Sequence, residues 1–121
     1  MNPSDDHSIR ISAPAKINLF LKVTGKRPDS YHELCTFMCP ISLYDTLTVT
    51  FGVKKILTLC SHPDVPDGEA NLAHRAAAAF LESIDCSEGV RISVEKKIPV
   101  AAGLGGGSSD AASILLAMNR Y

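Results

Sequence analysis

The sequence has no excess of charge of either sign: 12 lysines and arginines stand against 13 aspartates and glutamates, for a net charge of −1 in 121 residues. Because it has no polybasic stripe, nucleic acid is not expected as a partner. No uncharged apolar run approaches the roughly 20 residues that a membrane-spanning helix needs. The polar start, residues 1–10, also lacks the apolar core of a secretory signal. These absences predict a cytoplasmic protein that binds neither nucleic acid nor a membrane.

Cysteine is scarce as well, and Cys35, Cys39, Cys60 and Cys86 include no CxxC pair. Four cysteines are too few to predict a disulfide scaffold. His32 lies close enough in sequence to Cys35 and Cys39 to be considered with them as a metal ligand. In a strand, however, His32 would face away from both cysteines, because side chains alternate. We therefore predict no metal site, and interpret the cysteines as small buried residues in a reducing compartment.

Segments rich in apolar and β-branched residues predict the strands. The clearest covers residues 45–51, where apolar and polar residues alternate, and residues 56–60 are expected to pair with it through a turn at 52–55. Further strands are expected at residues 9–13, 17–24 and 90–94, with an extended segment at 35–40. Turn-forming residues predict loops at 25–32 and 61–68.

Two helices are expected, both from apolar residues at helical spacing. Over residues 71–83, Asn71 suits the N-cap, and apolar residues at helical spacing build one wide face. That face consists of Leu72, Ala76, Phe80 and Ile84, with Ala73, Ala77 and Leu81 beside them. The second helix is expected over residues 108–120, with these residues inward: Ala111, Ala112, Leu115, Leu116 and Met118. The order of strands, helix, strand, loop and helix predicts an α+β fold, a mixed sheet packed with helices and without regular βαβ alternation.

The most informative segment is PVAAGLGGGSSDAA, which starts at Pro99 and runs through a glycine-rich loop into the second helix. Its glycines allow positive φ and let a ligand approach the backbone closely. A phosphate would find several favourable groups here: the N–H groups of the loop and of the helix start, the positive end of the helix dipole, and the hydroxyls of Ser108 and Ser109. Asp110, one turn into the helix, complements the dipole and is expected to face outward.

Two familiar phosphate-binding motifs do not fit this segment. A P-loop requires a lysine immediately before its final serine or threonine, and here Gly107 precedes Ser108. A dinucleotide fingerprint requires a third glycine where Ser108 stands. The remaining alternative to a phosphate site is a flexible turn that ends in a serine N-cap.

The segment resembles the central motif of the GHMP kinases. Three further segments agree with this family in order and spacing: APAKINLFL at residues 13–21, PDSYHEL at 28–34, and Asn71-Leu72 at the start of an alanine-rich helix. These segments are most similar to the branch that phosphorylates a cytidine-diphosphate methylerythritol in non-mevalonate isoprenoid biosynthesis. The resemblance implies the N-terminal domain fold of this family, which is like domain 2 of ribosomal protein S5. It also implies an ATP-dependent small-molecule kinase that uses ATP with Mg²⁺ and an alcohol acceptor.

The resemblance also implies roles on the acceptor side. Lys16 would be catalytic, because a lysine beside the acceptor hydroxyl can polarise it and offset charge on the transferring phosphoryl group. Asn18 would hydrogen-bond the acceptor, Tyr31 would stack on cytosine and His32 would bind the edge of the base. Without the resemblance, a lysine at this position is usually a solvated surface charge. Tyr31 could equally be an aromatic residue that half-covers the core.

On the nucleotide side, the resemblance assigns a larger set. Asn71 and Leu72 would contact adenine, although an N-cap and a core leucine explain them as well. Lys96 would border the adenine pocket, with a solvated charge as its alternative. The phosphate-side residues implied by the motif are Pro99, Gly103, Leu104, Gly105, Gly106, Gly107, Ser108 and Ser109.

The family's catalytic aspartate, in a segment of the type GADVPF, and its C-terminal domain have no counterpart in these residues. We therefore expect residues 1–121 to be the nucleotide-binding N-terminal domain of a truncated kinase that binds nucleotide without turning over alone. Two alternatives stay open: another GHMP kinase, of the homoserine or mevalonate type, or a non-catalytic nucleotide-binding fragment.

Overall fold

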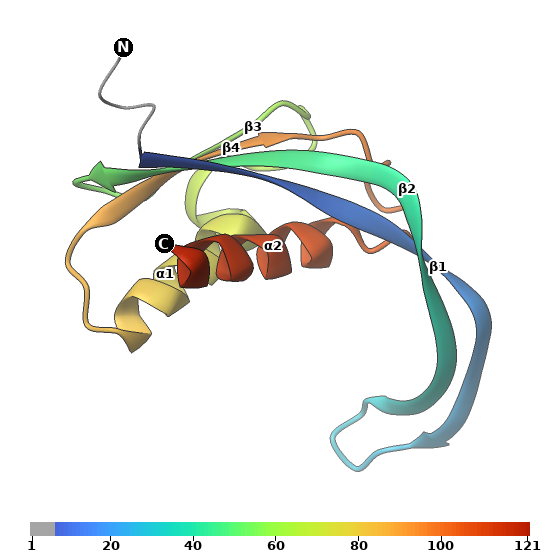
Figure 1. Cartoon of the computed structure of the whole chain (residues 1–121). Coiled ribbons are helices and arrows are strands. Elements are labelled where there is room, and N and C mark those ends of the chain that lie inside the picture. Colours follow the sequence, from blue (N-terminus) through green and yellow to red (C-terminus); the bar gives the residue numbers. More distant parts are fainter. Residues whose placement is uncertain (1–6) are drawn as a thin grey trace.

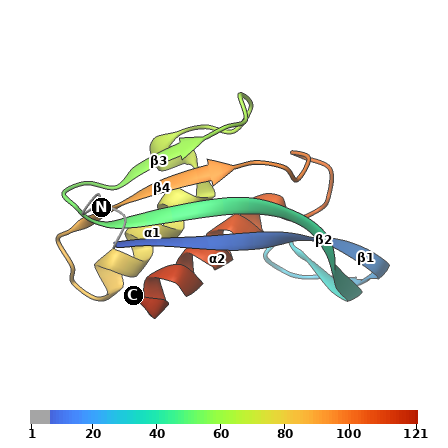
Figure 2. The same ribbon diagram turned by 45° about the horizontal axis from the view of Figure 1, so that its top comes forward.

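The computed structural model describes residues 7–121, so most of the polar stretch at residues 1–10 lies outside the described part. The described chain forms a four-stranded sheet with the strand order β1-β2-β4-β3, and two α-helices cover one face of it (Figures 1 and 2). The predicted α+β class is confirmed. Within residues 7–121, neither α-helix has the length and apolar character needed to cross a membrane.

Strands β1 (Ser8–Lys26) and β2 (His32–Val53) form one long antiparallel hairpin, in register from Ser8 opposite Thr50 to Lys26 opposite His32. The prediction that each would be broken into two separate segments is wrong. The chain bends at three register shifts and still keeps its pairing. Pro14 fits because β1 is an edge strand, where a missing N–H costs no ladder hydrogen bond.

The outer half of this hairpin, residues 16–40, is called the hairpin arm here. It curves out of the sheet toward the side of the helices, beyond the N-terminal end of α2 (Figure 1). Its tip is a tight turn in which the N–H of Arg27 donates to the carbonyl of Tyr31 at 2.6 Å, and Arg27 pairs with Asp29 at 3.0 Å. These contacts define the turn at the tip of the arm, outside the core.

Strands β3 (Leu57–Cys60) and β4 (Gly89–Glu95) differ from the predicted pairing. The strand at residues 56–60 was expected to pair with 45–51, but β4 lies between them, antiparallel to β2 and parallel to β3. The reason is burial: β4 places Val90, Ile92 and Val94 in the core, whereas Leu57 and Leu59 of β3 are exposed. The more apolar strand thus takes the central position.

Helices α1 (Leu72–Ser83) and α2 (Gly106–Arg120) pack on each other and on the sheet, with a short 3-10 turn (Gly68–Ala70) before α1. The predicted N-cap is confirmed, since Asn71 Oδ1 accepts from the N–H of Ala73 at 2.8 Å. The predicted inward face of α1 is confirmed for Ala73, Ala77 and Leu81, whereas that of α2 is largely wrong, because only Met118 of its predicted residues is buried. Buried residues on α1 are Ala73, Ala77 and Leu81, and those on α2 are Asp110, Ser113, Ile114, Ala117 and Met118. Small residues allow close approach, so larger ones such as Leu116 are left at the exposed flanks.

Candidate functional site

The glycine loop passes into helix α2 through a left-handed residue. Gly105, with φ 69° and ψ 23°, is the N-cap, and the helix begins at Gly106, two residues earlier than predicted. The N–H of Ser109 donates to the carbonyl of Gly105 at 2.9 Å. The N–H groups of Gly106, Gly107 and Ser108 precede it and have no partner within the helix, which is the usual anion-binding geometry. The alternative of a turn closed by a serine N-cap is wrong.

Lys16 links strand β1 to this loop through two hydrogen bonds. Its N–H donates to the carbonyl of Leu104 at 2.9 Å, and its Nζ donates to the carbonyl of Gly103 at 3.0 Å. Gly105 lies so close that a Cβ atom there would stand 3.0 Å from Lys16 Cε. The ammonium group of Lys16 is thus held at the glycine loop, although strand β1 is far from it in sequence.

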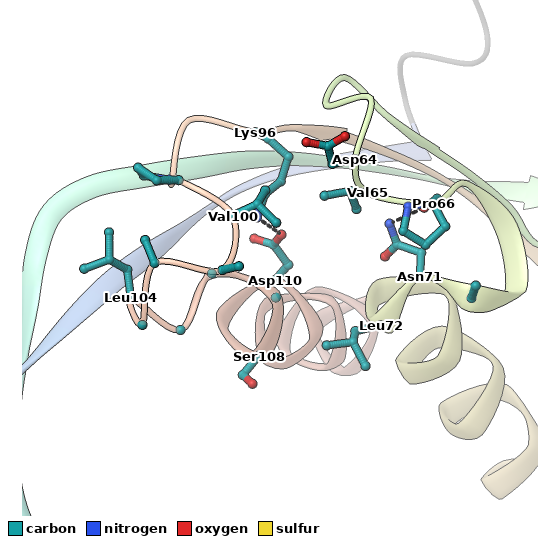
Figure 3. Close-up of a pocket in the computed structure, with 18 residues that line it drawn as sticks. Asp64, Val65, Pro66, Asn71, Leu72, Lys96, Val100, Leu104, Ser108 and Asp110 are labelled. Carbon is teal, nitrogen blue, oxygen red and sulfur yellow. Dashed lines mark hydrogen bonds and ion pairs between the residues drawn. The ribbon is translucent and has the colours of Figure 1, made fainter.

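A cavity of about 410 Å³ opens on one side of the loop (Figure 3). Its walls come from the segment before α1 and from the loop itself, and Asn71 Nδ2 donates to the carbonyl of Pro66 at 2.9 Å across one end. The lining is mainly apolar and backbone, with Asp64, Lys96 and Asp110 as its charged members. It brings together most of the predicted nucleotide-side residues: Asn71, Leu72, Lys96, Pro99, Gly103, Leu104, Gly105, Gly106, Gly107 and Ser108.

A second cavity, of about 830 Å³, lies on the other side of the same loop. It is lined by nine residues of β1, β2, the loop and α2: Pro14, Ala15, Lys16, Met38, Pro40, Gly103, Gly105, Ser108 and Ser109. Gly103, Gly105 and Ser108 line both cavities. A group bound at the start of α2 can therefore be reached from both cavities, and Lys16 lines the second cavity.

Three charged side chains form a buried cluster beneath the first cavity. They are Asp45 of β2, Lys96 directly after β4, and Asp110 of α2. Lys96 Nζ donates to Asp45 Oδ2 at 2.5 Å and to Asp110 Oδ2 at 3.1 Å. Asp45 Oδ1 also accepts from the N–H groups of Lys97 at 2.7 Å and Ile98 at 2.9 Å. Lys96 is thus neither a solvated charge nor free, and the prediction that Asp110 faces outward is wrong, since only 5% of it is exposed.

The two carboxyl groups of the cluster differ in their pKa values. Burial alone would raise the pKa of Asp45, but hydrogen bonds with Asp110, the N–H of Ile98 and the other donors hold it below its usual value. Burial raises the pKa of Asp110 to about 7, and its hydrogen bond with the Asp45 carboxyl adds to the rise. Near neutral pH, Asp110 is therefore the member of the cluster that gains or loses a proton.

This difference predicts a pH-dependent loss of stability. In the unfolded chain Asp110 titrates near 3.8, whereas in the folded chain its pKa is about 7, so the folded state binds more protons between these values. Stability from this group therefore falls as pH rises from about 4 to about 7. Urea unfolding midpoints of the natural chain should fall over this range relative to those of Asp110→Asn. Parallel curves for the two proteins would contradict the assignment.

Lys16 apart, the predicted acceptor residues on the arm line neither cavity. Tyr31 is 73% exposed at the tip, His32 begins β2, and Asn18 Oδ1 accepts from Thr36 Oγ1 at 3.0 Å. The alternative that Tyr31 half-covers the core is therefore wrong. Its ring is available for stacking, at the end of the arm that curves past the start of α2 (Figure 1).

Several site residues were not predicted from the sequence. Asp64, Val65 and Pro66 line the first cavity but belong to a segment interpreted only as a loop. Asp45 was treated as the first residue of a strand, and Asp110 as a surface charge. The available signal for Asp45 was an acid at the start of a strand whose neighbours alternate toward the core.

Comparison with known proteins identifies the class. Residues 71–121, which carry α1, β4, the glycine loop and α2, match the family model of the GHMP kinases N terminal domain. This agrees with the mixed sheet, the two helices on one face and the loop at the start of α2. The chain belongs to the GHMP kinases, and the resemblance inferred from its motifs is confirmed.

Within this class, the chain is similar to kinases that are all named for the same substrate. The 4-diphosphocytidyl-2-C-methyl-D-erythritol kinase of Desulfitobacterium hafniense (strain Y51) is 48% identical over 114 residues, which are 94% of this chain and 38% of that protein. A crystal structure of 4-(cytidine 5'-diphospho)-2C-methyl-D-erythritol kinase is 47% identical, with a TM-score of 0.75, over 93% of this chain and 40% of that one. This chain therefore spans about two fifths of these relatives.

A more distant structure shares the fold alone. Homoserine kinase from Cytophaga hutchinsonii is 20% identical, with a TM-score of 0.67, over 99% of this chain and 37% of that one. The sheet and helices are thus shared by structures of kinases whose names give different substrates, and the sequence identity is far lower in this second comparison.

Proposed function

We propose that this chain is the nucleotide-binding domain of a kinase that transfers the terminal phosphate of ATP to the hydroxyl of 4-diphosphocytidyl-2-C-methyl-D-erythritol. The observation that carries the proposal is the pair of cavities that meet at the glycine loop. The first cavity suits a nucleotide and is called the nucleotide cavity below. The second suits an acceptor and is called the acceptor cavity, and the start of α2 lies between the two. Residues 1–121 would form the N-terminal domain of that kinase in non-mevalonate isoprenoid biosynthesis, in the cytoplasm.

The glycine loop fits the phosphates of ATP. A Cβ atom at Gly106 would meet Ile98 Cγ2 and Lys96 Nζ at 3.1 Å, and one at Gly107 would meet Leu72 Cδ1 at 3.1 Å. Side chains would therefore fill the space beside the free N–H groups of α2, which suit phosphate oxygens. We propose Mg²⁺ as the counter-ion of the bound ATP, where it would neutralise charge on the phosphates.

Lys16 is proposed as the catalytic residue of this chain. Its side chain lines the acceptor cavity and reaches the carbonyl of Gly103 at 3.0 Å. From there an ammonium group can offset the charge that develops on the transferring phosphoryl group and can polarise the acceptor hydroxyl. Asn18, two residues further along β1, would hydrogen-bond the same acceptor.

A phosphotransfer assay with cytidine-diphosphate methylerythritol and homoserine as rival acceptors tests the function. The 121-residue chain should be assayed beside any longer product of the same reading frame. Because no lining residue of the acceptor cavity is acidic, we expect the short chain to bind ATP and to transfer phosphate slowly, if at all. Transfer to the cytidine substrate by the longer product supports the proposal, and preference for homoserine would overturn it.

The hairpin arm predicts where specificity for cytidine resides. Tyr31→Ala should weaken binding of the cytidine substrate by about 1–3 kcal/mol, the range for base stacking on an aromatic ring, and should leave ATP affinity unchanged. Tyr31→Phe is the matched control, because it retains the ring and should retain the affinity. Isothermal titration with each ligand measures both effects. An equal loss for both ligands would mean that Tyr31 acts through the structure of the arm.

A further inference from the structure

Asp110 has a feature that the proposed reaction does not use. Its Oδ1 is buried and has no hydrogen-bond partner among the described residues, while its Oδ2 accepts from Lys96. The residue lines the nucleotide cavity, and Figure 3 shows its side chain reaching from α2 toward Lys96 at the floor of that cavity. A buried polar atom without a partner costs free energy unless a ligand supplies one.

We propose that Asp110 takes up a proton when the phosphates of a nucleotide bind at the glycine loop, and that its neutral carboxyl then donates a hydrogen bond from Oδ1 to the nucleotide. This inference rests on the proposed function, and it adds a binding residue and a proton linkage to it. The step is a proton transfer only: an O–H bond of a solvent hydronium ion breaks, an O–H bond forms on the carboxylate of Asp110, and no other bond changes.

The charge of the buried cluster supports the uptake. With both carboxyls ionised, Asp45, Lys96 and Asp110 together carry one negative charge, and with Asp110 protonated they carry none. Lys96 Nζ stands 3.1 Å from the Cβ position of Gly106, so the cluster lies directly under the start of α2. An anion bound there is repelled by a negative cluster in a poorly hydrated place, and a proton removes that repulsion.

The proton goes to Asp110 because Asp45 is already satisfied as an anion. Asp45 accepts from two backbone N–H groups and from Lys96, whereas Asp110 accepts from Lys96 alone and shares a further hydrogen bond with the Asp45 carboxyl, which favours protonation of Asp110. The raised pKa of Asp110 agrees with this order. A protonated carboxyl is a donor, and phosphate or hydroxyl oxygens of the nucleotide are suitable acceptors.

Two other charged side chains face this region. Asp64, on the segment before α1, is exposed and lines the same cavity, and Lys16 on β1 reaches the loop from the acceptor side. Neither touches Asp110 within the described contacts, so both should act on ATP affinity without the same pH dependence. Asp64 therefore offers a matched control for the loss of one negative charge.

The test is the affinity of the purified protein for ATP with magnesium, measured from pH 6 to pH 9. The natural protein should lose affinity above pH 7, by up to about tenfold per pH unit for one linked proton, relative to Asp110→Asn. The asparagine amide can donate without taking up a proton, so its curve should keep only the pH dependence of ATP itself. Asp64→Asn should keep the curve of the natural protein.

The outcomes separate this inference from the proposed function. Binding with the same pH curve for the natural protein and Asp110→Asn overturns the proton linkage and leaves the proposed function intact. Failure of the natural protein to bind ATP overturns both. If Asp110→Asn does not fold, carbon-13 NMR of the Asp110 carboxyl in the natural protein replaces it: its titration midpoint should rise when ATP is added, and an unchanged midpoint overturns the proposal.

Discussion

Replacing Asp45 with alanine is expected to lower the free energy of unfolding by about 3–5 kcal/mol, as is usual when one partner of a buried ion pair is removed. The carboxyl is fully buried and accepts from the N–H groups of Lys97 and Ile98 as well as from Lys96. Its removal leaves two backbone donors without a partner and leaves Lys96 with Asp110 alone. Urea denaturation followed by circular dichroism measures the loss.

An exposed ion pair provides the control for this substitution. Arg27 and Asp29 lie 3.0 Å apart at the tip of the arm, with about half of each side chain exposed. Asp29→Ala should cost no more than about 1 kcal/mol, because surface ion pairs contribute little. A loss of similar size for the two substitutions would mean that the cluster around Lys96 does not stabilise the fold. Asp45→Asn, which keeps an oxygen for the backbone N–H groups, should fall between them.

Local features of this fold could be predicted from the sequence, because their causes are local. Asn71 caps α1 through its own side chain, so the helix was placed to within one residue of its start. The alternation in residues 45–51 identified a strand that does place Leu47, Val49 and Phe51 in the core. The glycine-rich segment predicted a loop that joins a helix start, and only the first residue of that helix was misplaced.

The sheet order and the inward face of α2 could not be predicted in this way, because they depend on contacts between distant segments. Residues 52–55 are short enough for a hairpin, yet β4 separates the two strands that they connect. The periodicity of α2 indicated a helix but not which side would pack inward. Its buried side contains the polar residues Asp110 and Ser113, and Asp110 was expected to face outward.

The buried cluster shows the same limit for the site. Asp45, Lys96 and Asp110 come from three separate segments, and each is individually typical of a solvated charge. Burial of such groups is tolerated only when they are paired, and the pairing exists only in the folded chain. Lys96 was predicted as a site residue through the family resemblance. Asp45 lies in none of the matched segments, and Asp110, although inside the glycine-rich motif, was expected to face outward.

Replacing Gly105 with valine is expected to lower ATP affinity by more than about 100-fold, which corresponds to a loss of about 2.7 kcal/mol or more. The residue has φ 69°, a conformation that a β-branched residue adopts only with strain. Its new Cβ would also stand 3.0 Å from Lys16 Cε and 3.2 Å from Lys16 Cγ, on the side where both cavities meet. The loop would have to move, and the N–H groups that start α2 would move with it.

Gly52→Val is the matched control for backbone strain. Gly52 has φ 78°, at the far end of β2, and a Cβ there would meet no atom within 4 Å. It should lose stability through the same unfavourable backbone conformation, yet retain ATP affinity. Isothermal titration on folded samples, with thermal unfolding measured in parallel, separates the two effects. Unchanged ATP affinity in a folded Gly105→Val protein would overturn the assignment of the glycine loop to phosphate, because the valine side chain occupies the space where the phosphates would lie.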